Sequence, residues 1–170
     1  MSHRGYKHLL LAVDFGPGSD ILVERALMMR DRFAARLSIV NVVDYVPPGT
    51  DYAGGAFVAE PVLPDDFKLE QELLDVAKQE LDALGERLGV PPEDRIIEAG
   101  PTGRSIQHVA RDLGADLLIV GVHERSWLGR LLGSTPKSLL THEVCDMLAV
   151  RIGSDEASDA RPVKAGDTDA

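Results

Sequence analysis

Short apolar runs that alternate with segments of helical period constrain the fold of this chain more than any other feature. Strands that alternate with helices are joined by right-handed crossovers and pair in parallel, with helices covering the sheet. The pattern therefore predicts an α/β fold, an open and mostly parallel five-stranded sheet with helices on both faces. The predicted strands are Leu9 to Val13, Leu37 to Val43, Arg95 to Ala99, Leu117 to Val120 and Asp146 to Arg151.

The segments between these runs carry helix signals. Turn residues from Gly16 to Asp20 precede the first helix, and Gly100 to Gly103 precede a third. Asp65 to Leu88 has apolar residues at near 3.6 spacing, which predicts a long amphipathic helix. Pro136 is expected near the start of a short fourth helix. Residues 44–64 are rich in Pro and Gly and are expected to form a loop, either mobile or functional.

The length of 170 residues fits one domain, which we assign to residues 1–152. Residues 153–170 contain five acidic and two basic residues, and Val163 is their only large apolar residue. Such a segment cannot bury enough apolar surface to offset the entropy of ordering. We expect it to be a disordered acidic tail whose deletion leaves the fold intact.

The charge balance and the cysteine count exclude several classes of function. The formal net charge is −10, so the chain lacks the basic surface that nucleic acids require. A single cysteine, Cys145, allows neither an internal disulfide nor a cysteine-based metal site. The apolar runs are far shorter than the roughly 20 residues of a membrane helix, and no secretory leader is visible. We expect a cytoplasmic protein that binds neither nucleic acid nor membrane.

One edge of the predicted sheet is the natural place for a ligand. Open α/β sheets bind ligands beyond the carboxyl ends of their strands, where the strand order reverses. Asp14 follows the first strand and precedes a glycine-rich turn, so its carboxylate is expected to face that crevice. Its role as a cap for nearby amides and its role as a ligand contact are equally open.

The segment from Gly121 to Ser134 is a second candidate, because it leads from a strand end to a helix start with glycines at both borders. Backbone amides at such places bind phosphate. The segment matches neither the Walker nor the Rossmann pattern, so a plain loop remains the competing interpretation. His123 could act as a base or a ligand, but a hydrogen-bonded or solvated histidine is the more common case. No catalytic triad or metal-binding histidine pair is legible.

Three segments together resemble the universal stress protein family. They are Tyr6 to Asp14, Asn41 to Asp44 and Gly121 to Arg151, and the resemblance extends from residue 6 to residue 152. The nearest type is the A type of that family. The resemblance implies the strand order 3-2-1-4-5 and a homodimer.

Nucleotide-binding members of this family carry a glycine, two residues, a second glycine, nine residues, and then a glycine with a hydroxyl residue. Gly121 fits the first position, but Glu124 replaces the second glycine. Gly133 and Ser134 fit the last pair one residue early. A carboxylate there adds bulk and repels phosphate. The loop instead resembles the A type, which is not regarded as binding ATP.

If nucleotide binds, the resemblance implies a set of contact residues. Adenine and ribose would lie among Ala12, Asp14 and Val42, with Val120 and Gly121 below and Gly133, Ser134 and Thr135 at the phosphates.

Three functions follow as hypotheses. The leading one is a cytoplasmic stress-response protein of the A type, without chemistry or a cofactor of its own, that binds an unidentified protein partner. It would dimerise through the edge strand Asp146 to Arg151, where a charge at Leu148 or Val150 should favour the monomer. The alternative is an ATP-binding stress sensor that uses the crevice at the carboxyl ends of strands 1 and 4. A nucleotide hydrolase is the third, with Asp14 as its one candidate group.

Overall fold

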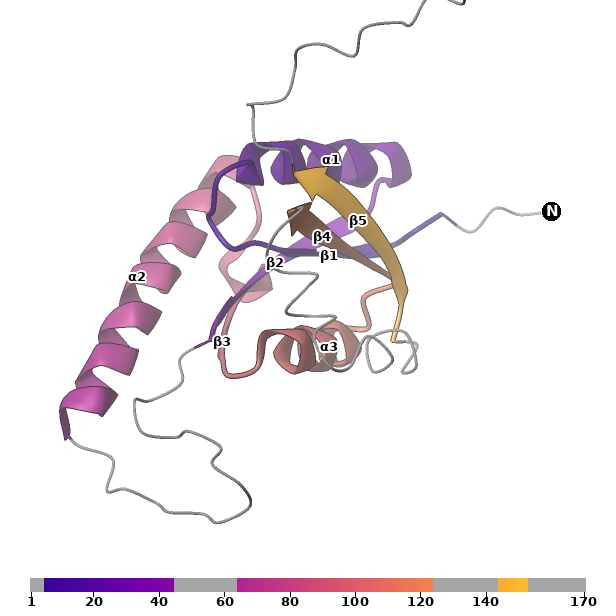
Figure 1. Ribbon diagram of the computed structural model, residues 1–170. Coiled ribbons are helices and arrows are strands. Elements are labelled where there is room, and N and C mark those ends of the chain that lie inside the picture. The colour runs from indigo at the N-terminus through magenta and orange to yellow at the C-terminus, as the bar shows by residue number, and fades with distance from the viewer. Residues whose placement is uncertain (1–4, 45–63, 124–143, 153–170) are drawn as a thin grey trace, which may run out of the picture.

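The computed structural model describes residues 5–44, 64–123 and 144–152, and within them it contains one five-stranded parallel sheet with the order β3-β2-β1-β4-β5 (Figure 1). This confirms the predicted fold class and strand order, and every strand pair is parallel. The strands are β1 (His8–Ala12), β2 (Arg36–Val43), β3 (Arg95–Ala99), β4 (Leu117–His123) and β5 (Asp146–Ile152). The helices are α1 (Ser19–Phe33), α2 (Pro64–Leu88), the 3-10 turn η1 (Pro92–Asp94) and α3 (Thr102–Leu113).

The sheet is covered on both faces, as predicted. Alternate residues of β1 divide between two cores, since successive side chains of a strand point to opposite faces. Leu9 and Leu11 join the core beneath α1 and α2, whereas Leu10 and Ala12 join the core beneath α3. Figure 1 shows α1 and α3 on opposite sides of the sheet. Right-handed crossovers explain why the helices lie on both faces. The chain moves in one direction along the sheet from β1 to β3, which places α1 and α2 on one face, and then reverses direction to reach β4, which places α3 on the other.

The connection from β1 to α1 is compact and conformationally constrained. Phe15 has φ of 55° and Gly18 has φ of 83°, so two of its residues occupy the left-handed region. Glycine adopts this region at little cost, whereas Phe15 must be held there by its surroundings. Phe15 packs partly buried against the α1 and α2 core, which supplies that restraint. The turn thereby starts α1 directly behind the end of β1.

Strand β5 forms one edge of the sheet, as the sequence predicted. Val150 and Ile152 are buried against the α1 side, whereas Met147 and Ala149 are exposed. Leu148 also packs against that core. A charge at Leu148 or Val150 would therefore disturb the core itself, so these positions are wrong for testing a dimer. Met147, Ala149 and Arg151 form the exposed alternate set of this strand.

Several sequence predictions fall outside the described residues. They are the loop at 44–64 beyond Asp44, the short helix near Pro136, and the acidic tail at 153–170, so the domain boundary at residue 152 stays a prediction. In the part of the chain that is described, none of the helices has the length and apolar composition needed to cross a bilayer.

Candidate functional site

The carboxyl ends of β1 and β4 lie side by side at the point where the strand order reverses. Ala12 is paired with Val120 across these two strands. Both side chains are buried in the core beneath α3, so they lie below the exposed ends of the two strands. The structure thus brings the predicted residues Ala12, Val120 and Gly121 to one place. This is where an open parallel sheet offers a ligand crevice.

Asp14 lies just past the end of β1 and is exposed. Its Oδ1 accepts a hydrogen bond from the backbone N–H of Gly16 at 3.1 Å, and it lies 3.4 Å from the Ser19 hydroxyl oxygen. The Ser19 hydroxyl also lies 2.6 Å from the carbonyl oxygen of Gly16, and this shorter contact is the better position for its single proton. Asp14 therefore caps its own turn, as one of the two sequence interpretations predicted. Its exposure leaves a ligand contact open.

Strand β2 places two further residues near this edge. Val42 is half-buried and packs against the α3 core, one strand away from Asp14. Its neighbour Asn41 is buried, and its side-chain amide donates to the carbonyl oxygen of Val13 at 2.8 Å. This bond joins the backbone just after β1 to β2, and so holds in place the residue that precedes Asp14. Sequence reasoning missed it, although a lone Asn inside an apolar strand was a visible signal.

Gly121 has a packing role in addition to the one that the family resemblance implies. A Cβ atom on Gly121 would lie 2.3 Å from Cδ1 of Ile152, and one on Gly18 would lie 1.8 Å from Cγ2 of the same residue. Ile152 is only 2% exposed. Gly121 of β4 and Gly18 of the β1–α1 turn therefore leave the space that the side chain of Ile152, the last residue of β5, occupies. The absence of a side chain at Gly121 is explained without a ligand.

The phosphate half of the predicted site cannot be described. Gly133, Ser134, Thr135 and Glu124 all lie outside the described residues, and so does the side chain of His123. Within residues 5–44, 64–123 and 144–152, no group of three side chains is arranged to hold a metal ion. The described part of the site is thus the exposed Asp14 turn above a buried floor.

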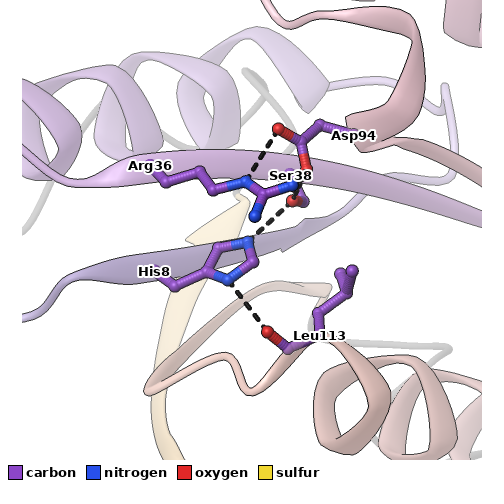
Figure 2. A network of polar contacts seen from close by, with 5 residues as sticks. All are labelled: His8, Arg36, Ser38, Asp94 and Leu113. Atoms are coloured by element: carbon purple, nitrogen blue, oxygen red, sulfur yellow. Dashed lines mark hydrogen bonds and ion pairs between the residues drawn. The ribbon is translucent and has the colours of Figure 1, made fainter.

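A second polar cluster, which sequence reasoning missed, lies at the amino edge of the sheet (Figure 2). The Nε2 atom of His8 is 2.8 Å from the Ser38 hydroxyl oxygen, which is 2.6 Å from Oδ1 of Asp94. Ser38 is completely buried, and Asp94 contacts it rather than His8. The order of contacts differs from that of a catalytic triad, and a substrate cannot reach the hydroxyl. Polar residues inside two apolar strands were the available signal.

Comparison with known proteins identifies relatives along almost the whole described chain. Residues 5–151 match the profile of the Universal stress protein family. Universal stress protein A homolog 2 of Coxiella burnetii is 34% identical over 148 residues, which cover 86% of this chain and 96% of the relative. Universal stress protein A of Escherichia coli K12 is 28% identical over 152 residues, which cover 89% of this chain and 98% of the relative.

Solved structures show the same fold. The universal stress protein UspA from Lactobacillus plantarum superposes with a TM-score of 0.57 at 23% identity, over 86% of this chain and 98% of that one.

Proposed function

This chain belongs to the universal stress protein family, and we propose that it acts as a cytoplasmic stress-response protein of the A type. In this proposal the protein is a homodimer that works by binding a protein partner and does not bind ATP tightly. The curated relatives named above support the A type, since both carry that name and are matched over nearly their full length.

The observation that carries the dimer is the edge position of β5. On the residues described, β5 pairs with β4 alone, so its outer backbone groups face away from the sheet. An edge strand with free amides and an apolar side chain such as Met147, which is 40% exposed, is a hazard unless another chain pairs with it. A two-fold contact between two copies of β5 removes both edges at once.

A proline at position 149 tests this proposal on the backbone alone. Successive N–H groups of a strand point to opposite sides. The N–H of Asp146 points toward β4, where it donates to the carbonyl oxygen of Asp116, so the N–H of Ala149, three residues later, points away from β4. Ala149→Pro should convert the dimer to a monomer in light scattering at micromolar concentration while the melting temperature falls by only a few degrees. Ala149→Thr keeps the amide and should remain dimeric. A monomeric unmodified protein, or a dimeric proline variant, would contradict the β5 interface.

Two features of the described crevice support weak ATP binding. The Asp14 carboxylate is already engaged with the amide of Gly16. Ile152 already fills the space beside Gly121 that the missing side chain would occupy, so this glycine leaves no room there for a ligand. Glu124 and the net charge of −10 add repulsion toward a triphosphate.

The alternative, an ATP-binding stress sensor, is favoured by one observation. Asp14 is an exposed carboxylate at the switch point, where ribose hydroxyls are held in other α/β folds. The 260/280 nm absorbance ratio and mass spectrometry of the freshly purified protein distinguish the two proposals. Protein that retains stoichiometric nucleotide would favour the sensor, and protein free of nucleotide would favour the A type.

A further inference from the structure

The cluster at the amino edge joins four elements through a continuous chain of polar contacts (Figure 2). The Nδ1 atom of His8 lies 3.1 Å from the carbonyl oxygen of Leu113, at the end of α3. The opposite ring nitrogen contacts Ser38, and Ser38 contacts Asp94. Arg36 holds the same carboxylate with two bonds, from Nε to Oδ2 at 2.9 Å and from Nη2 to Oδ1 at 2.6 Å.

The donors and acceptors in this chain of contacts determine how many protons the ring of His8 carries. A carbonyl oxygen only accepts, so the contact with Leu113 requires a proton on Nδ1 of His8. An ionised carboxylate also only accepts, so the contact with Asp94 uses the single proton of the Ser38 hydroxyl. The remaining contact, between Nε2 of His8 and the Ser38 oxygen, then needs a proton on Nε2. With Asp94 ionised, all three bonds form together only when the ring of His8 is doubly protonated.

A neutral His8 could keep all three contacts only if Asp94 were protonated instead. Burial favours that neutral acid, but the bonds from Arg36 and Ser38 and the charge of Arg36 outweigh burial and hold the pKa of Asp94 below its usual value. The two-bond contact with Arg36 is the geometry of an ionised carboxylate. The extra proton therefore belongs on His8.

We propose that His8 carries both ring protons in the folded protein and that the cluster is a pH-sensitive lock on the amino edge of the sheet. When rising pH removes the Nε2 proton, the single hydroxyl proton of Ser38 cannot serve both His8 and Asp94, so one of these two contacts must break. Either the 2.8 Å contact between His8 and Ser38 or the 2.6 Å contact between Ser38 and Asp94 then joins two acceptors and has to lengthen. A single proton thus decides whether the side chains of His8, Ser38 and Asp94 form one continuous chain of hydrogen bonds.

The surroundings of His8 favour a cation. Both oxygens of the Asp116 carboxylate face this strand and accept the backbone N–H groups of Lys7 and His8 at 2.8 and 3.0 Å. The carbonyl end of α3 carries the negative end of the helix dipole. Other charged or titratable groups near this edge include Tyr6 and Lys7 before β1, Arg36 on β2, Glu93 and Asp94 on η1, Arg111 and Asp112 near the end of α3, Cys145 just before β5 and Asp146 at its start.

Nitrogen-15 NMR of the histidine side chains in the full chain measures this directly. Spectra from about pH 5 to pH 9 span the range in which histidines normally titrate. His8 should keep two protonated ring nitrogens at pH values above the range in which a solvent-exposed histidine normally loses its second proton. The chain has five histidines, so His108→Gln serves as the control that assigns one of the other signals, and it should leave His8 unchanged.

Two variants separate the lock from a merely structural contact. Asp94→Asn removes the negative charge, so His8 should hold its second proton about tenfold more weakly, a shift of about one pH unit. Ser38→Ala removes the partner of Nε2 and should act in the same direction, which covers the case in which Asp94→Asn does not fold. An unprotonated Nε2 across the whole range in the unmodified protein would overturn the proposal. So would variants that leave the titration of His8 unchanged.

Discussion

The two ends of this sheet each hold an aspartate, and the two carboxylates behave differently. Asp14 at the carboxyl edge is exposed, and among the described residues its hydrogen-bond contacts are with Gly16 and Ser19, two and five residues away. Asp94 at the amino edge is 2% exposed and bonds to Arg36 and Ser38, which are more than fifty residues away in the sequence. Local bonds shape one turn, whereas long-range bonds join separate elements. We therefore expect the amino edge to contribute more to stability than the turn at Asp14.

The largest effect that this comparison predicts comes from truncating the buried aspartate. Asp94→Ala leaves Ser38 without its acceptor and Arg36 without its counter-ion, so we expect a loss of about 2 to 4 kcal/mol in the free energy of unfolding. The half-exposed guanidinium of Arg36 keeps the loss below that of a fully buried pair. Urea unfolding measures it. A loss below about 1 kcal/mol would mean that Asp94 contributes no more to stability than Asp14 does, which would contradict the comparison.

A second prediction concerns the glycine that admits Ile152 at the carboxyl edge. Gly18→Ala places a Cβ atom against Ile152 at a φ of 83°, so we expect a loss of about 2 to 3 kcal/mol. Gly89→Ala is the matched control, because it has a φ of 65° but nothing within 4 Å of the added atom, and it should cost about 1 kcal/mol. Equal losses in thermal or urea unfolding would mean that Ile152 does not pack there.

Acidification should weaken the amino edge without a mutation. The pKa of Asp94 is lowered in the folded protein, because bonds from Arg36 and Ser38 outweigh its burial. Its stabilising contribution is therefore complete above the unfolded value, about 3.9, and is lost as the pH falls through the folded value. Urea midpoints below about pH 4 should fall more steeply for the unmodified protein than for Asp94→Asn. Parallel curves would show that this carboxylate makes no such contribution.

The smallest expected effect belongs to the exposed aspartate. Asp14→Ala removes a cap from the Gly16 amide, which water can replace, so we expect a loss of no more than about 1 kcal/mol. The same urea titration used for Asp94→Ala checks it. A loss equal to that of Asp94→Ala would erase the difference between the two edges.

The fold could be predicted from the sequence because its signals are local. Apolar runs and helical periods fixed five strands and three described helices to within a few residues, and the family resemblance supplied the strand order. The carboxyl edge was also foreseeable, since Asp14 follows directly from its strand. The inward direction of Leu148 was missed, although the charged Arg151 marks residues 147, 149 and 151 as the exposed alternate set and leaves Leu148 on the core side. The meeting of His8, Ser38 and Asp94 was not foreseeable, because it depends on strand pairing between distant segments.

Calorimetric titration with Mg-ATP tests the proposed function most directly. We expect a dissociation constant weaker than about 100 µM, which corresponds to roughly −5.5 kcal/mol. Glu124→Gly should tighten any binding, and Asp14→Ala should weaken it, if the crevice at the ends of β1 and β4 is the site. Binding by the unmodified protein weaker than about 100 µM is the result that the A-type proposal predicts. A dissociation constant of about 1 to 10 µM would contradict it and favour the ATP sensor.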